Sequence, residues 1–262
     1  MSRQTETIER DGDEVAIREC TTIEEFDACV RLQREAFGLP DLELSPRRHL
    51  IVSRLAGGWI LGAYRPDGEL VGFVHHLVSV SGAEIGGYSH MMAVAASYQN
   101  RGLGARLKWA QRARAMEEGR NYIGWTFEPM QARNAHFNLN RLGVVVRSYA
   151  VNFYGWDGGT EAFADGKQFN LDSDRLMAKW ELRTPRVEAC ARGEHPAHSS
   201  APVAIVEIPP DWKTLRHEDG RTAQSELRRV RSEFQKHFAA GLVCAGFERD
   251  GARPRYLFFR ES

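Results

Sequence analysis

The sequence lacks an excess of charge of either sign. Its 262 residues include 35 basic side chains (Lys and Arg) and 35 acidic ones (Asp and Glu). Proteins that hold nucleic acid or an anionic membrane surface by electrostatic attraction normally carry a basic surplus. We therefore expect neither nucleic acid nor a membrane as a partner.

Long apolar runs are missing as well. No stretch approaches the roughly 20 apolar residues that span a bilayer. Residues 1–14 are polar and acidic, without the apolar core of a signal peptide. We therefore expect a cytoplasmic protein. The hydrophobic share of 42% is still sufficient for a folded core.

Cysteine is scarce and scattered, with no CxxC pair, which favours reduced structural thiols over a disulfide framework. The four cysteines are Cys20, Cys29, Cys190 and Cys244. The spacing of Cys190, His195 and His198 resembles that of zinc ligands, but three ligands in a Pro- and Ser-rich stretch are too few, so we expect no metal. The chain has no G-x-S-x-G or HExxH motif, which argues against hydrolase chemistry.

Hydrophobic periodicity predicts an alternation of strands and helices. The predicted strands are 15–20, 59–64, 70–79, 88–95, 122–127, 144–154 and 175–182. The predicted helices are 23–37, 46–55, 103–116 and 134–142. Residues 185–201 have the composition of a linker, and a small β-α-β-β unit follows. The pattern predicts an α/β protein with two domains, residues 14–184 and 202–262.

The helix predicted over residues 103–116 has one apolar face, and its basic residues lie outside that face. The apolar face is predicted to consist of Leu103, Leu107, Ala110 and Ala113. The side chains predicted to lie elsewhere are Arg106, Lys108, Arg112 and Arg114.

The most informative stretch is the heptapeptide that runs from Tyr98 to Gly104 and reads YQNRGLG. It lies between a predicted strand and this helix. The N–H groups at a helix start have no partner within the helix, and the helix dipole favours negative charge there. Gly102 and Gly104 have no Cβ, so a diphosphate could approach the main chain closely. A plain tight turn is the alternative.

Two common phosphate-binding motifs do not fit. A P-loop requires Lys-Ser or Lys-Thr after its last glycine, where this chain has Ala105 and Arg106. A dinucleotide fingerprint requires a glycine before the two that are present. Instead, Gln99, Gly102 and Gly104 match the pattern Q/R-x-x-G-x-G/A in register. In this respect the chain resembles the GNAT superfamily of acyl-CoA-dependent N-acyltransferases, over about residues 14–184. That family commonly has a proline where this chain has Ala96.

The resemblance implies a GNAT-like mixed, splayed β-sheet flanked by helices, with the small C-terminal unit as an extension. It also implies transfer of an acyl group, expected to be acetyl, from acetyl-CoA or another acyl-CoA to an amine of a small molecule or peptide. The residues that it assigns to the CoA site are Met92, Ala93, Val94, Gln99, Asn100, Arg101, Gly102, Leu103, Gly104, Ala105, Arg106, Asn134 and Asn138.

The second family motif is incomplete. When it is anchored on Gly143, Leu139 stands where the family has the tyrosine that protonates the CoA thiolate. Tyr149 or Tyr154 of the next strand could replace that tyrosine as the general acid, although a tyrosine on a strand more often packs in the core.

Two residues are candidates for the general base. Glu128 follows an apolar strand, where apolar walls would raise the pKa of its carboxyl group; the alternative is a loop glutamate that caps the next helix. His90 is predicted by strand alternation to share a face with Met92 and Val94, or else to be a core histidine. His75 and His76 should point to opposite faces of the sheet.

Two other functions remain open. A catalytically silent acyl-CoA-binding or regulatory module would keep the CoA site without turnover, as the missing tyrosine suggests. A donor such as an aminoacyl-tRNA would keep the fold, but the balanced charge argues against it. The C-terminal unit, about 60 residues long, is too small to bury both faces of its strands alone, so we expect it to pack on the first domain or to form a homodimer contact.

Overall fold

The computed structural model of the chain describes residues 15–38, 40–155, 171–195, 198, 200–249 and 252–261. The chain divides into two compact units at Gly124–Trp125. In the described part of the chain, no helix combines the length and the apolar character needed to cross a bilayer. A cytoplasmic location stays a prediction.

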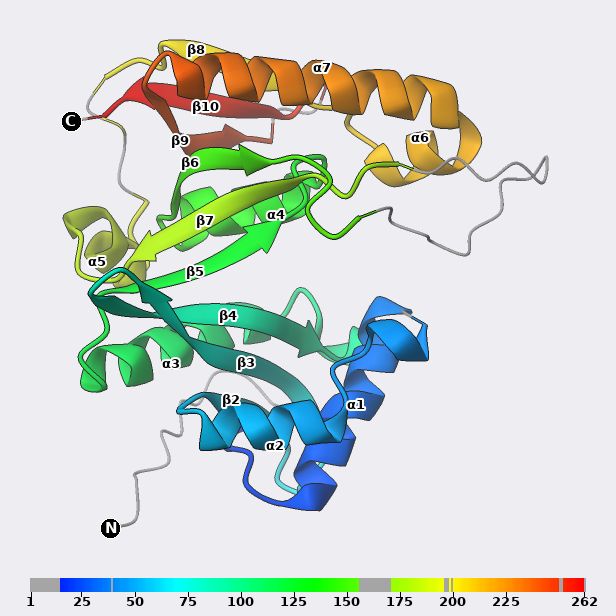
Figure 1. The fold of residues 1–262 in the computed structure, drawn as a ribbon, viewed down its shortest axis with the longest axis vertical. Coiled ribbons are helices and arrows are strands. Elements are labelled where there is room, and N and C mark those ends of the chain that lie inside the picture. Colours follow the sequence, from blue (N-terminus) through cyan, green and yellow to red (C-terminus); the bar gives the residue numbers. More distant parts are fainter. Residues whose placement is uncertain are drawn as a thin grey trace. The chain divides into compact units, whose positions relative to one another are not determined.

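The first unit is an open, mixed sheet with helices on both faces (Figure 1). Its strands are β1 (Ala16–Glu19), β2 (Trp59–Tyr64), β3 (Leu70–Ser81), β4 (Glu84–Val94) and the start of β5 (Tyr122–Phe127). Its helices are α1 (Ile23–Phe37), α2 (Arg47–Leu55) and α3 (Leu103–Glu117), with the 3-10 turns η1 (Asp41–Glu43) and η2 (Ala96–Tyr98). The strands lie in chain order, antiparallel except for the parallel pair β4–β5.

Local sequence fixes both ends of α1. The Thr22 side chain accepts a hydrogen bond from the backbone N–H of Glu25, and the Glu25 carboxylate accepts one from the N–H of Thr22, which makes a capping box. At the other end Gly38 adopts φ 61°, a left-handed conformation that glycine takes without steric cost. These are the boundaries that the sequence predicts.

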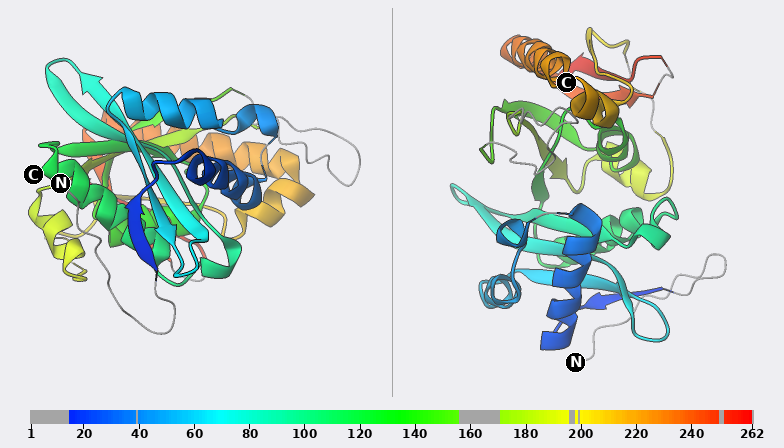
Figure 2. Two further views of the ribbon diagram at one scale, coloured as in Figure 1. Left: turned by 90° about the horizontal axis from the view of Figure 1, so that it is seen from below. Right: turned by 90° about the vertical axis from the view of Figure 1, so that its right-hand side faces the viewer.

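The two faces of the first sheet carry different helices (Figure 2). On one face, Phe26 and Leu32 of α1 and Leu50 of α2 pack on Phe73 and Ala93. On the other face, α3 lies against the alternate residues of β3 and β4. The sheet is covered from both sides, which explains why all of β2 and residues 71–76 of β3 are buried.

The buried stripe of α3 differs from the predicted one. Its members are Leu103, Leu107, Lys108, Gln111 and Ala115. Ala113, expected in the core, is exposed. Lys108, expected outside, is buried, and its Nζ donates to Gln111 Oε1 over 2.7 Å. Burial lowers the pKa of the Lys108 amine well below its usual value. The prediction was wrong because it counted apolar residues, whereas this stripe buries a polar pair.

A β-bulge in β4 also corrects the predicted orientation of His90. The register with β3 pairs Met91 with His75 and Ser89 with His76, so His90 is the extra residue. A bulge breaks the two-residue alternation of side chains. His90 therefore lies on the α2 side, with His75, whereas Met92 and Val94 lie on the α3 side near Gly104. The two neighbouring histidines of β3 do point to opposite faces, as predicted: His75 contacts Ser53 of α2 and His76 contacts Gln111 of α3.

The second unit continues from β5 with strands of antiparallel direction and a long covering helix (Figure 1). Its strands after β5 are β6 (Val145–Ala150), β7 (Arg175–Glu181), β8 (Ala204–Glu207), β9 (Leu242–Glu248) and β10 (Arg255–Arg260), in the spatial order β5-β7-β6-β9-β10-β8. Its helices are α4 (Ala132–His136), α5 (Pro185–Ala191), α6 (Trp212–Glu218) and α7 (Gly220–Ala239), and a π-helical turn, η3 (Phe137–Arg141), continues α4.

Helix α7 covers one face of these strands. The ring of Phe234, which is fully buried, lies 4.9 Å from the ring of Tyr256 and 5.2 Å from that of Phe258. Tyr256 donates its buried hydroxyl to the carbonyl of Pro129 over 2.7 Å. The side-chain amide of Asn140 exchanges two hydrogen bonds, each 3.0 Å long, with the backbone of Phe247. The C-terminal strands are thus joined to the segment that follows β5.

Two helices of the second unit were not predicted. Residues 185–201 were expected to be a linker, but Pro185–Ala191 form α5, with Thr184 as the N-cap and Pro185 in the first turn. Helix α6 begins after Asp211, which caps it. The division into domains 14–184 and 202–262 stays a prediction. Pairing of Val146 in β6 with Cys244 in β9 shows that the C-terminal strands extend the sheet that contains β6 and β7.

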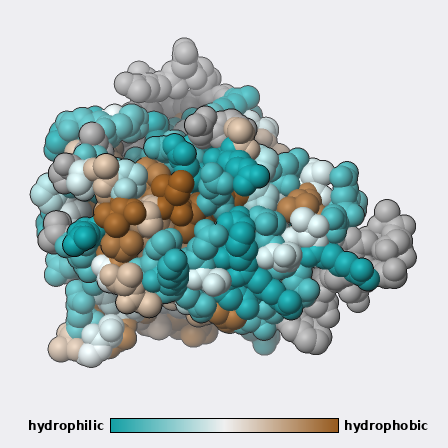
Figure 3. Space-filling view, turned by 90° about the horizontal axis from the view of Figure 1, so that it is seen from above, coloured by the Kyte–Doolittle hydropathy of each residue, from teal (hydrophilic) through white to brown (hydrophobic). Residues whose placement is uncertain are grey.

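Strand β8 forms an edge of the second unit. Val203, just before it, is 52% exposed and Ile205 within it is 43% exposed. The space-filling view shows apolar side chains gathered in a patch on an otherwise largely hydrophilic face (Figure 3). A homodimer contact in this unit stays a prediction.

Candidate functional site

The end of β4 has one open edge. The parallel ladder between β4 and β5 consists of two residue pairs, Gly87–Ile123 and Tyr88–Gly124, and goes no further in the described residues. The N–H of Ala95 donates to the carbonyl of Val71 in β3. Because backbone groups alternate between the two edges of a strand, Ala93 also pairs toward β3.

The same alternation turns the backbone groups of Met92 and Val94 toward the open edge. The backbone of Ala93 thus faces β3, and only its two neighbours face the open edge. Binding of CoA by Met92, Ala93 and Val94 stays a prediction. A strand edge with unpaired N–H and C=O groups can accept another extended, amide-containing chain.

A tight turn leads from this edge to α3. The side chain of Gln99 donates from Nε2 to the carbonyl of Val94 over 3.2 Å and so ties the turn to the end of β4. Asn100 (φ 64°) and Gly102 (φ 81°) both adopt the left-handed conformation. The two left-handed residues reverse the chain direction, and Gly102 becomes the N-cap of α3.

The first turn of α3 has no side-chain cap. In the described part of the chain, no carbonyl or side chain accepts a hydrogen bond from the N–H groups of Leu103, Gly104 and Ala105. Four N–H groups are orphaned at any helix start, and the partial positive charge of the dipole is concentrated there. A Cβ on Gly104 would lie 3.6 Å from the nearest atom, in Met92. The N-terminus of α3 therefore has free N–H groups and open space, the arrangement that suits an anion.

The two arginines of this region have different surroundings. Arg106 donates from Nη2 to the carbonyl of Val15 over 2.6 Å and anchors the start of β1. Arg101 is exposed, and its Cζ lies 5.6 Å from the centre of the Tyr98 ring. Of the two, Arg101 is the cation at the surface of the turn.

His90 lies on the bulge of β4, where its Nε2 is 2.9 Å from the Ser45 hydroxyl oxygen. Part of the ring is exposed. Partial burial, and then the neighbouring His49, lower the pKa of His90. His90 is therefore neutral at physiological pH.

Glu128 belongs to the second unit, directly after β5. Its Oε1 accepts a hydrogen bond from the indole N–H of Trp212 over 2.6 Å, and its Oε2 accepts one from Gln131 Nε2, also over 2.6 Å. No side chain of the described residues caps helix α4, so Glu128 does not cap the following helix. Both carboxylate oxygens are fixed in position beside a small pocket that Trp212 and Arg216 help to line.

The two candidates for the general acid, Tyr149 and Tyr154, both lie in the second unit but have different surroundings. Tyr149 donates its hydroxyl to Asp174 over 2.6 Å, and burial, then this bond, raise the pKa of the phenol. A raised pKa weakens Tyr149 as an acid. Tyr154 is 60% exposed, and its hydroxyl lies 3.1 Å from Thr126 Oγ1. Tyr154 is therefore the more accessible proton donor.

Comparison with known proteins agrees with this geometry. The sequence profile of the Acetyltransferase (GNAT) family matches residues 24–143, which include β4, the glycine turn and α3. This region of the chain belongs to the GNAT superfamily. No curated protein matches it in sequence. Family and fold support acyl transfer in general.

Solved structures of GNAT proteins are similar to this chain. A protein assigned to the GNAT family from Desulfovibrio desulfuricans superposes with a TM-score of 0.51 at 17% identity, over 64% of this chain and 99% of the other. The ribosomal-protein-S18-alanine N-acetyltransferase from Escherichia coli gives 0.49 at 15%, over 65% and 95%. A GNAT family acetyltransferase from Elizabethkingia anophelis with acetyl-CoA bound gives 0.46 at 18%, over 64% and 97%.

The second GNAT motif lies in α4 and η3. Leu139, at the position of the GNAT tyrosine, is fully buried. Asn134 is exposed and donates from Nδ2 to Gln131 Oε1 over 3.1 Å. Asn138 is 5% exposed, and its carbonyl accepts the N–H of Val144. Binding of CoA by Asn134 and Asn138 stays a prediction.

One group of histidines in this GNAT fold was not predicted from the sequence. His49 of α2 and His75 of β3 lie beside His90. No sequence spacing indicates this group, because the three residues come from separate elements. The cluster could have been predicted only with knowledge of how α2 packs on the sheet and of the bulge in β4.

Proposed function

We propose that this protein transfers an acyl group, with acetyl as the expected one, from acyl-CoA to an amine. One observation carries the proposal: the open edge of β4 at Met92 and Val94 leads, through the Gln99 turn, into the uncapped start of α3. An open strand edge suits the two amides of a pantetheine arm, and the bare helix start suits a diphosphate.

Local chemistry supports acyl-CoA as the donor at this site. The N–H groups of Leu103, Gly104 and Ala105 can donate to diphosphate oxygens without losing any partner in the described part of the chain. Gly102 and Gly104 keep the approach to the backbone open. Arg101 adds a surface cation beside the turn.

The reaction requires two proton transfers. As the amine nitrogen attacks the thioester carbonyl, the C–N bond forms, the nitrogen loses a proton, and the C–S bond breaks to release a thiolate that takes up a proton. We assign the base role to Glu128, because its hydrogen bonds to Trp212 and Gln131 orient the carboxylate. We assign the acid role to Tyr154, because its phenol is exposed whereas that of Tyr149 is bonded to Asp174.

A second function is a silent acyl-CoA-binding module. The buried Leu139 in place of the GNAT tyrosine favours it, because leucine cannot donate a proton. The two functions share the donor site and differ in turnover.

Calorimetric titration with acetyl-CoA, followed by a thiol-release assay, tests both functions. We expect saturable binding and release of CoA thiol with at least one class in a panel of amines, polyamines, amino acids, aminoglycosides and peptides with a free N-terminus. The absence of binding at millimolar acetyl-CoA would refute both functions. Binding without thiol release across the panel would support the silent module.

Replacing Glu128 by glutamine should lower turnover at least tenfold, because the amide cannot accept the amine proton. The affinity for acetyl-CoA should not change, because Glu128 has no part in holding the donor. Steady-state rates and calorimetry on the Glu128→Gln variant measure the two quantities. Glu218→Gln, at an exposed position of α6, is the matched control. An unchanged rate and pH profile in Glu128→Gln would show that another group is the base.

A further inference from the structure

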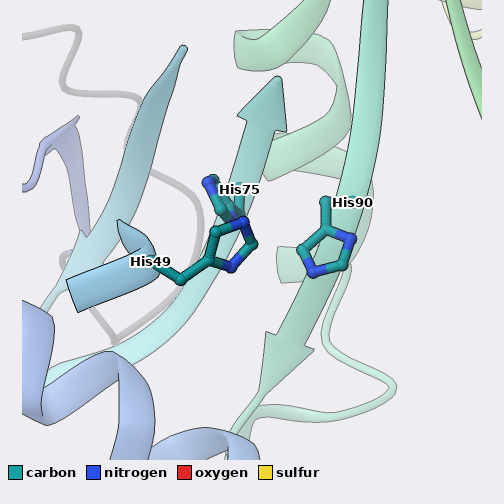
Figure 4. Close-up of side chains that lie close together, drawn as sticks. All are labelled: His49, His75 and His90. Atoms are coloured by element: carbon teal, nitrogen blue, oxygen red, sulfur yellow. The ribbon is translucent and has the colours of Figure 1, made fainter. Parts of the chain in front are cut away.

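Three histidine side chains from separate elements of the first unit point toward one another (Figure 4). They are His49 of α2, His75 of β3 and His90 on the bulge of β4. One ring nitrogen of each lies within 4.8 Å of one from each of the others. The ring centres are 5.3, 5.3 and 5.4 Å apart, and the ring planes cross at 69°, 83° and 85°. The three rings therefore surround one point almost symmetrically.

The hydrogen bonds around His75 fix its tautomer. Ser53 donates its hydroxyl hydrogen to the carbonyl of Leu50 over 2.9 Å, so its oxygen must accept from His75 Nε2–H over 2.7 Å. The proton of the neutral ring is then on Nε2, and Nδ1 presents a bare lone pair. His75 is fully buried, and its Nδ1 has no hydrogen-bond partner among the residues that the structure describes.

A buried lone pair without a partner is costly, and this one belongs to a ring of the histidine cluster. Simple packing of three aromatic rings would leave that cost uncompensated. A metal ion at the centre of the cluster would remove it.

The spacing suits a tetrahedral metal. Zinc binds histidine nitrogen at about 2.0–2.1 Å, so two imidazoles on one tetrahedral ion have ring centres about 5.2 Å apart. The three observed separations match this value closely. The ligand nitrogens would have to approach to about 3.4 Å from each other, which rotation of the partly exposed His49 and His90 rings permits.

The donor set and its surroundings identify the class of metal. Neutral imidazoles suit zinc, copper and nickel, whereas magnesium and calcium require oxygen ligands. Among the described residues, no carboxylate or thiol joins the group. The Ser53 hydroxyl holds Nε2 of His75, the nitrogen that would not bind the metal, as an outer-shell partner does. The Ser45 hydroxyl lies 2.9 Å from Nε2 of His90 and helps to position that ring.

We propose that His49, His75 and His90 bind one divalent transition-metal ion, Zn²⁺, with a fourth position open to water or another ligand. The fourth position is accessible because His90 is exposed and His49 is half-buried. The metal would join α2, β3 and the bulge of β4 within the first unit. The bound state uses a lone pair of His90, so His90 would not then act as a general base. Binding of Zn²⁺ at this site does not depend on whether the protein transfers acyl groups.

Metal titration of tag-free protein, stripped with a chelator, tests the proposal. Calorimetry should give one Zn²⁺ per chain with a dissociation constant below micromolar. Co²⁺ in the same site should show the intense visible absorption of a tetrahedral complex, which a loosely bound octahedral ion lacks. Both readouts are independent of enzymatic activity.

Variants locate the site. His49→Asn and His90→Asn should each weaken Zn²⁺ binding at least 100-fold and abolish the Co²⁺ band. Ser53→Ala should weaken binding about 10- to 100-fold, as loss of an outer-shell partner does. The matched control is His76→Asn, the neighbouring buried histidine on the opposite face, which should bind Zn²⁺ with unchanged affinity.

The proposal fails if the stripped protein binds no stoichiometric Zn²⁺ or Co²⁺. It also fails if His90→Asn binds both ions as tightly as the parent. His75→Asn is the most direct variant but alters a buried position, so a circular-dichroism melt must show that it folds. If it does not fold, the more exposed His49 and His90 variants decide the outcome.

Discussion

Replacing Ala105 by glutamate is expected to weaken acetyl-CoA binding about 100-fold, or about 2.7 kcal/mol. Ala105 is the third residue of α3, and its N–H is among those with no acceptor in the described part of the chain. A carboxylate there would lie within a few ångströms of a bound diphosphate and repel it. In the free protein, the same carboxylate would interact favourably with the helix dipole, so α3 should be at least as stable as before.

Because Ala105→Glu is expected to weaken acetyl-CoA binding without destabilising α3, a loss of affinity could not be attributed to unfolding. Ala105→Gln is the matched control, because it adds the same bulk without charge and should lose much less affinity. Calorimetric titration at low and high salt measures both variants, and the gap between them should narrow as salt screens the repulsion. Equal affinities of the two variants for acetyl-CoA at low salt would show that the diphosphate binds elsewhere.

Replacing Asp174 by alanine is expected to lower the free energy of unfolding by about 3–5 kcal/mol. The Asp174 side chain is fully buried, and it accepts hydrogen bonds from Nε and Nη2 of Arg231, over 2.8 and 2.9 Å. It also accepts the hydroxyl of Tyr149 and the N–H of Asn152. Its removal would leave several partly buried donors, the Arg231 guanidinium among them, without their acceptor at once.

Urea unfolding measures this change in stability. Asp172→Ala is the matched control, because Asp172 also contacts Arg231, over 2.6 Å, but is 35% exposed and should cost about 1 kcal/mol or less. A loss in Asp174→Ala as small as that of the control would show that the buried network adds little. The network also bears on catalysis: if Tyr149 only supports Asp174, Tyr149→Phe should keep the turnover of the parent.

Local patterns predicted much of the first unit. Thr22 and Gly38 mark the ends of α1 because capping depends on residues within one turn of the helix. The turn from Gln99 to Gly104 was predicted for the same reason, since both of its glycines have roles that depend on local backbone geometry. The mixed, open sheet followed from the GNAT resemblance rather than from periodicity.

The rest depended on contacts between distant residues. The bulge at His90 results from the register between two strands, which strand alternation alone does not reveal. Lys108 was placed outside the core because its burial depends on Gln111, a polar partner on the same helix. The cluster of His49, His75 and His90 requires α2 to pack on the sheet. Such features follow from tertiary packing and leave no periodic trace in the sequence.

A crystal structure of the protein with CoA would test the proposed donor site. We expect diphosphate oxygens within hydrogen-bonding distance of the N–H groups of Leu103, Gly104 and Ala105, and the pantetheine amides paired with the backbone of Met92 and Val94. Density for the diphosphate at any other place, with those N–H groups bonded to protein or solvent instead, would contradict the account.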